Sequence, residues 1–159
     1  MKNRIEFVKV RCEVDQDPDL SYLGEYSRLA DSDNAIDRRA RGDMGHGELQ
    51  YFNPAMTGEE TGNPDSPEQD YQRMEAHNRG AWCMVGVWAE AEFIVGGTVQ
   101  RIRSGGLWGI ESDSDKSYFE EVAREELSSL ADILKELGFS TKQVKAAMPT
   151  SIVLESVGS

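Results

Sequence analysis

The residues best able to do enzyme chemistry are two histidines, His46 and His77, and two cysteines, Cys12 and Cys83. No ligand stands at metal-binding spacing from either histidine, and the cysteines form no Cys-x-x-Cys pair, so we predict no metal site. A nucleophile pair of Cys83 and His77 would need a thiol from a predicted strand to turn outward. We therefore predict no cofactor and no catalytic residue. A small enzyme with a site near His46 and His77 is the alternative.

Three other groups of residues resemble catalytic or ligand-binding motifs, but each has a simpler structural explanation. The carboxylates of Glu90 and Glu92 resemble a glycosidase pair, but arginines predicted on the next strand would neutralise them. The glycines of 104–106 are followed by acids rather than by lysine, which argues against a phosphate loop. The acidic turn at 111–115 lacks the twelfth-position glutamate of a calcium loop, so helix capping explains it better than a cation site does.

Acidic side chains dominate the charge of the chain. Its 159 residues hold 29 Asp and Glu against 17 Lys and Arg, a net charge of −12. Segments 15–37 and 111–138 account for this excess. Such a field repels nucleic acid and anionic membranes and favours a basic protein partner. No apolar run is long enough for a signal peptide or a membrane span, so we expect a cytoplasmic protein.

One helix is strongly predicted, from about Lys116 to Leu137. Its apolar residues recur at three- and four-residue steps, and Gly138 supplies a stop signal. On its other side four acids fall within about 60° of one another, in a row about 22 Å long at helical rise. This acidic row consists of Glu121, Glu125, Asp132 and Glu136.

Strands are predicted at 5–14, 81–95 and 98–110, the last interrupted by a bulge at 104–106. Gly96 and Gly97 make a two-residue hairpin loop, which pairs Val95 with Thr98. In that register Glu92 lies opposite Arg101 and Glu90 lies opposite Arg103. The 81–95 strand would place small apolar residues against the long helix, and Trp82 and Trp88 on its second face.

The predicted fold class is therefore α+β. We expect one domain over residues 1–159, with a mainly antiparallel sheet of about four strands backed by the long helix. Residues 31–66 are rich in Asp, Gly, Asn and Pro and predict a long irregular loop. Within it Arg38, Arg39 and Arg41 are interpreted as an internal partner for the two acidic segments rather than as a nucleic-acid site.

The run RIRSGGLWGIESDSD at 101–115, followed by EEL at 125–127 and LGF at 137–139, resembles a pattern in small acidic proteins of phages, plasmids and other mobile elements. The resemblance covers roughly the last half of the chain and brings no activity or catalytic residue. It implies a genomic setting in which antirestriction and anti-CRISPR inhibitors occur.

The sequence thus predicts a non-enzymatic module that binds a basic surface of a host protein or ribonucleoprotein. The expected contacts are Asp113 and Asp115 with the acidic row. If the second strand face is uncovered, Trp82 and Trp88 mark an interface, and a self-associating module becomes a further alternative.

Overall fold

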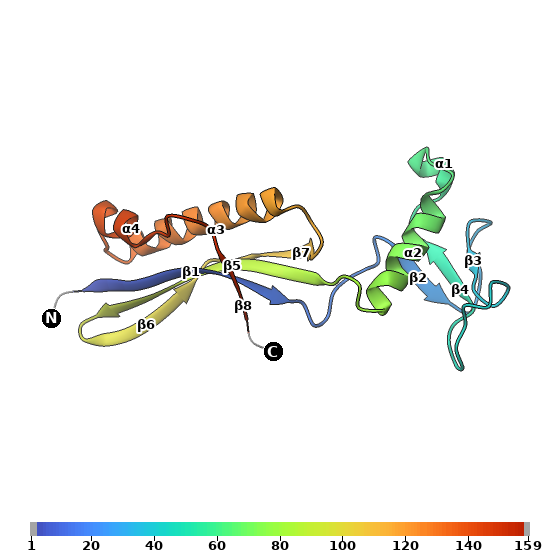
Figure 1. Cartoon of the computed structure of the whole chain (residues 1–159), viewed down its shortest axis with the longest axis horizontal. Helices are drawn as coiled ribbons and strands as arrows, with labels where there is room; N and C mark the ends of the chain where they lie inside the picture. The colour runs from blue at the N-terminus through green and yellow to red at the C-terminus, as the bar shows by residue number, and fades with distance from the viewer. Residues whose placement is uncertain (1–2, 158–159) are drawn as a thin grey trace. The chain divides into compact units, whose positions relative to one another are not determined.

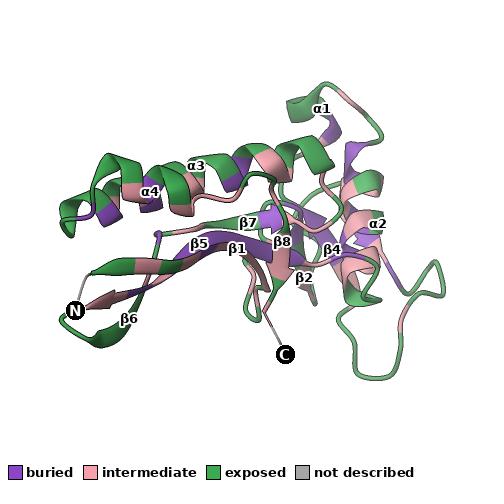
Figure 2. Cartoon of the chain, turned by 60° about the vertical axis from the view of Figure 1, so that its left-hand side comes forward, coloured by how far each residue is buried: buried purple, intermediate pink, exposed green. Residues whose placement is uncertain are grey.

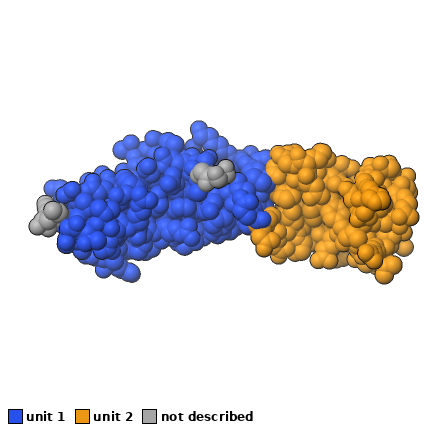
Figure 3. Space-filling model, turned by 90° about the horizontal axis from the view of Figure 1, so that it is seen from below, with its two compact units in different colours: residues 1–16, 83–159 blue, residues 17–82 orange. Residues whose placement is uncertain are grey.

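The computed structural model describes residues 3–157. By their contacts the residues form two compact units, coloured separately in Figure 3: unit 1 is residues 1–16 with 83–159, and unit 2 is residues 17–82. Unit 1 contains β1 (Arg4–Val14), β5 (Met84–Val95), β6 (Thr98–Arg103), β7 (Leu107–Glu111), α3 (Lys116–Glu136), α4 (Thr141–Ala147) and β8 (Leu154–Ser156). Unit 2 contains β2 (Gly24–Ser27), β3 (Ile36–Asp37), β4 (Tyr51–Pro54), α1 (Gly58–Thr61) and α2 (Ser66–Asn78).

Unit 1 is a five-stranded sheet in the order β6-β5-β1-β8, with β7 also paired to β5. All of its pairings are antiparallel except that of β8 with β1. Helices α3 and α4 lie on one face of this sheet (Figure 1). The predicted α+β class, with a mainly antiparallel sheet backed by a long helix, is confirmed, although the sheet has one strand more than expected.

The core of unit 1 lies between α3 and the sheet. Leu130 and Leu134 of α3 have no exposed surface, and they pack with Ala89, Ala91 and Phe93 of β5. Nearer the start of α3, Val122 and Ala123 pack against further apolar residues of the sheet, which are Val10, Val85, Val87 and Ile110. Figure 2 shows the result as a helix buried toward the sheet and exposed on its other side. The three-four periodicity therefore identified the packing face correctly.

The hairpin between β5 and β6 has the predicted register. Val95 pairs with Thr98, Glu92 with Arg101 and Glu90 with Arg103. The loop residues Gly96 and Gly97 have φ values of 57° and 81°, the left-handed backbone that a two-residue hairpin loop with matching twist requires.

The predicted interruption at 104–106 separates β6 from β7. Ser104 stays paired with Ala89 of β5: its backbone N–H donates to the Ala89 carbonyl at 2.8 Å, and its hydroxyl accepts the Ala89 N–H at 2.9 Å. Helix α3 fixes the segment from its other side, because the Glu126 carboxylate accepts hydrogen bonds from Ser104 and Gly106. A side chain of the helix thus sets where the edge strand resumes.

Unit 2 corrects the expectation of an irregular segment at 31–66. That segment holds β3, β4 and α1, and β4 is the central strand of a three-stranded sheet ordered β2-β4-β3. Phe52 of β4 is fully buried, with its ring centroid 5.5 Å from those of Tyr26 and Tyr71. The core of unit 2 is therefore built from aromatic rings of three elements. It contains no long apolar run that a sequence pattern would detect.

Candidate protein-binding surface

The acidic row lies on the outward side of α3, as its spacing predicts. Glu121, Glu125, Asp132 and Glu136 are all exposed. Among the ion pairs within 4.0 Å formed by residues 3–157, none involves any of the four carboxylates. The row is therefore open to solvent and available to an external cation.

Two cationic side chains of α3 form ion pairs with a carboxylate that is not part of the acidic row. Lys116 Nζ lies 3.9 Å and Arg124 Nη2 lies 3.8 Å from carboxylate oxygens of Glu120, which sits one position before the row. Both pairs have the i,i+4 spacing that brings side chains together on a helix. Since Glu120 takes both cations, the row keeps its negative charge.

An acidic pocket adjoins the start of α3. It has a volume of about 550 Å³ and is lined by Glu111, Asp113, Asp115 and Tyr118, with Gly109, Ile110 and Ser114. Asp115 occupies the N-cap position, yet its carboxylate accepts no helix N–H. The Ser114 hydroxyl, one position earlier, donates to the Glu111 carbonyl at 2.6 Å. The expectation that capping uses these acids is wrong in this respect.

Within residues 3–157, no group of three or more His, Cys, Asp or Glu side chains could hold a metal ion. With Tyr118 half-exposed at its wall, the pocket combines carboxylates with an aromatic ring. This combination suits an organic cation such as a guanidinium group.

The placement of Trp82 and Trp88 on one strand face is wrong. Strand β5 begins at Met84, so Trp82 precedes it and belongs to unit 2. There the Trp82 indole donates to the Arg73 carbonyl at 2.9 Å, and the Arg73 guanidinium lies 3.8 Å from its ring centroid. Trp88 belongs to unit 1, where its indole donates to Glu13 and Arg103 covers its ring. Both indoles are buried, which removes the exposed aromatic face assumed for self-association.

The exposed tryptophan is Trp108, at 41%. Its ring lies against the backbone of Gly86, where a Cβ would overlap it. The sequence offered one signal for this contact, a glycine in the interior of a strand, which marks a close approach.

The carboxylates of β5 are structural. Glu92 pairs with Arg101 at 3.2 Å, as predicted, but Glu90 pairs with Arg11 of β1 at 3.1 Å. Arg103 lies opposite Glu90 in the ladder, yet its guanidinium sits 4.7 Å from the Trp88 ring centroid. Each carboxylate therefore has a cationic partner within the sheet, which accounts for it without a catalytic role.

Two of the three arginines form ion pairs inside unit 2, but their partners lie outside the acidic segments 15–37 and 111–138, so that part of the interpretation is wrong. Arg38 is 6% exposed, and its Nη2 atom donates to Glu75 at 3.0 Å and to Glu48 at 3.1 Å. Arg41 donates to Glu68 at 2.8 Å. Burial lowers the pKa of Arg38, but hydrogen bonds to Tyr71 and Glu75 outweigh it and raise the pKa. Arg39 is exposed.

The two histidines lie in different elements of unit 2. His46 is exposed in the 44–50 loop, and His77 lies at the end of α2 with its ring centroid 5.0 Å from that of Trp82. A pocket of about 280 Å³ beneath this loop is lined by Tyr26, Arg38, Gly47, Glu48, Leu49 and Asn78, a set that includes neither histidine. Cys12 and Cys83 are half-buried free thiols. Burial, and then the neighbouring Cys83, raise the pKa of Cys12, which disfavours the nucleophilic thiolate.

Comparison of the chain with protein-family models, with curated proteins and with solved structures gave no match. No helix in residues 3–157 has the length and apolarity needed to cross a membrane.

Proposed function

We propose that this chain is a non-enzymatic binding module whose acidic surface, the acidic row of α3 together with the acidic pocket, covers a basic surface of a partner protein. The observation that carries the proposal is the acidic row, four exposed carboxylates along one side of a packed 21-residue helix. Because Leu130 and Leu134 fix α3 to the sheet, the row is held in place before a partner arrives. Rigid presentation lowers the ordering cost of binding, and complementary charge speeds encounter.

The acidic pocket extends this face around the start of the helix. Asp113 and Asp115 supply charge there, and Tyr118 supplies an aromatic surface. An arginine of the partner entering the pocket would gain both charge-assisted hydrogen bonds and ring contact. The pocket and the row together define a binding surface directed at Lys and Arg side chains.

For the partner, we propose a nucleic-acid-handling enzyme of a bacterial defence system, such as a CRISPR effector or a restriction enzyme. The resemblance of 101–139 to proteins of mobile elements supports this class. Such enzymes need basic channels, and a protein that occupies the channel excludes nucleic acid. The row carries about one charge per 6 to 7 Å at helical rise, whereas duplex DNA carries about one per 1.7 Å. Occlusion of the channel therefore fits the module better than imitation of a duplex.

Cleavage of DNA by a purified CRISPR effector nuclease and by a purified restriction enzyme tests this proposal. We expect the wild-type chain to inhibit at least one of them, and the Glu121→Lys, Glu125→Lys double variant to inhibit much less. The matched control is Glu25→Lys with Asp33→Lys, which changes the net charge equally at two exposed residues of unit 2. Failure to inhibit either nuclease would exclude these targets, and equal inhibition by both double variants would exclude the row as the contact.

A further inference from the structure

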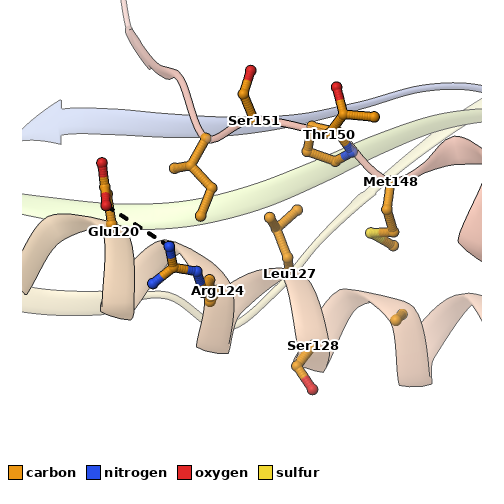
Figure 4. Close-up of a pocket in the computed structure, with 10 residues that line it drawn as sticks. Glu120, Arg124, Leu127, Ser128, Met148, Thr150 and Ser151 are labelled. Atoms are coloured by element: carbon orange, nitrogen blue, oxygen red, sulfur yellow. Dashed lines mark ion pairs between the residues drawn. The ribbon is translucent and has the colours of Figure 1, made fainter. Parts of the chain in front are cut away.

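A groove runs beside the acidic row, between α3 and the segment that follows α4 (Figure 4). Its volume is about 420 Å³, within the range of about 300 to 1,000 Å³ typical of ligand sites. The apolar part of its lining consists of half-buried side chains from both walls: Leu127, Ala131, Met148, Pro149 and Ile152. These side chains remain partly exposed, whereas Leu130 and Leu134 of α3 are fully buried.

The polar lining of the groove carries no net charge. Arg124 lines it, but its guanidinium is paired with Glu120, which lines it too (Figure 4). The remaining polar groups are the hydroxyls of Ser128, Thr150 and Ser151. An apolar side chain can enter this groove without leaving an ionised group unpaired. A charged side chain would lose water and find no unpaired counter-charge in the lining, so its entry is less favourable.

The groove and the acidic row share a border at Ser128. Residues three and four positions apart are neighbours on a helix surface, and those of Ser128 are Glu125 and Asp132 of the row. The next residue, Ser129, has the same two acidic neighbours but is absent from the groove lining. A single extended segment can therefore reach the groove and the row at once.

We propose that the groove receives one apolar side chain of a basic segment in the partner, whose lysines or arginines contact the acidic row. This inference rests on the proposed function, and it adds a specificity element that charge alone lacks. Exposed carboxylates attract any cationic surface, whereas a groove of fixed shape selects segments with an apolar residue at the right distance from their charges. The occupant is thus a peptide segment with basic residues flanking a leucine-sized anchor.

Fluorescence polarisation with two labelled peptides tests the inference. Both peptides are built from lysine and glycine, and one has leucine in place of its central glycine. We expect the leucine peptide to bind wild-type protein about tenfold more tightly, the gain that burial of such a side chain can give. The Ser128→Trp variant should remove this gain while leaving the glycine peptide unaffected, and Ser129→Trp should keep the gain.

The results separate this inference from the proposed function. Equal binding of both peptides to wild-type protein, or an unchanged leucine gain in Ser128→Trp, overturns the groove proposal and leaves the acidic row standing. Weaker binding of both peptides to Glu121→Lys, Glu125→Lys, with the ratio between their affinities preserved, supports a groove that acts independently of the row. If neither peptide binds at low salt, the groove proposal is wrong, while the nuclease assay still decides the proposed function.

Discussion

Glu126 of α3 holds Ser104 in place at the break between β6 and β7. One of its carboxylate oxygens accepts the Ser104 hydroxyl at 2.8 Å and the Gly106 backbone N–H at 2.8 Å. Ser104 is 2% exposed, so the bond forms away from water. The contact joins two separate parts of the sequence pattern, the SGG run at 104–106 and the EEL run at 125–127. We infer that these residues of the pattern are needed to attach α3 to the sheet.

Replacing Glu126 with alanine should destabilise unit 1 by about 1 to 3 kcal/mol, because a buried hydroxyl and a backbone N–H would lose a charged acceptor. The control is Glu125→Ala, since the Glu125 side chain is exposed and should contribute less than about 0.5 kcal/mol. Urea denaturation followed by circular dichroism measures the difference. Equal stabilities of the two variants would contradict this role for Glu126.

Gly86→Ala should destabilise unit 1 by about 1 to 3 kcal/mol, the usual cost of forcing an extra carbon into a packed site. Its Cβ would overlap the Trp108 ring. Gly105 provides the control, because a Cβ there meets nothing within 4 Å. Thermal unfolding of both variants checks this. If the Trp108 ring is the obstacle, Trp108→Ala combined with Gly86→Ala should cost less than the sum of the single changes.

Arg38→Met should loosen unit 2, because removal of one partner from a buried ion pair costs about 3 to 5 kcal/mol. The Arg38 side chain is 7% exposed and its partner Glu75 is 19% exposed. Hydrogen exchange of peptides from residues 17–82 should therefore accelerate. Arg39→Met, at an exposed neighbour, should leave exchange unchanged. Unaltered protection in Arg38→Met would show that the network does not hold unit 2 together.

Unit 2 should lose stability as pH rises from about 10 to about 12. Burial, and then the nearby Glu75 carboxylate, raise the pKa of Tyr26 to about 12, compared with 10.0 for an ordinary tyrosine. In this window the folded chain keeps a phenolic proton that the unfolded chain has released, so unfolding is increasingly favoured. Absorbance titration should show Tyr26 and Tyr71 ionising after an exposed tyrosine, because burial also raises the pKa of Tyr71, and Tyr26→Phe should reduce the late transition by one tyrosine. Ionisation of every tyrosine near pH 10 would contradict the assignment.

Sequence patterns predicted unit 1 well because its long elements repeat one signal many times. The leucine spacing gave the packing face of α3, and Gly96-Gly97 gave the hairpin register. The same reasoning failed for the 31–66 part of unit 2, where β3 spans only Ile36–Asp37 and β4 only Tyr51–Pro54. Elements this short show no period, and their core comes from rings that meet only in the folded chain.

At the candidate surface, helix geometry predicted the exposed acids but not their neighbours. The row follows from 3.6-residue spacing alone. The groove is formed by α3 and residues 148–152, which lie far apart in the chain, so no local pattern could reveal it. The prediction placed Trp82 in the strand because the alternation of small apolar residues with larger ones continues through residues 81–83. The strand β5 begins only at Met84. The expected ion pair of Arg103 with Glu90 does not form, because the Arg103 guanidinium lies over the Trp88 ring instead.

The central claim is that the acidic row is a binding surface and not merely a source of net charge. Binding of a fluorescein-labelled oligolysine peptide, measured across a range of salt concentrations, tests it most directly. Affinity should fall with salt for the wild type and for the Glu25→Lys, Asp33→Lys control, and it should be weaker and flatter for Glu121→Lys, Glu125→Lys. Identical affinities and salt slopes for the two double variants would contradict the claim.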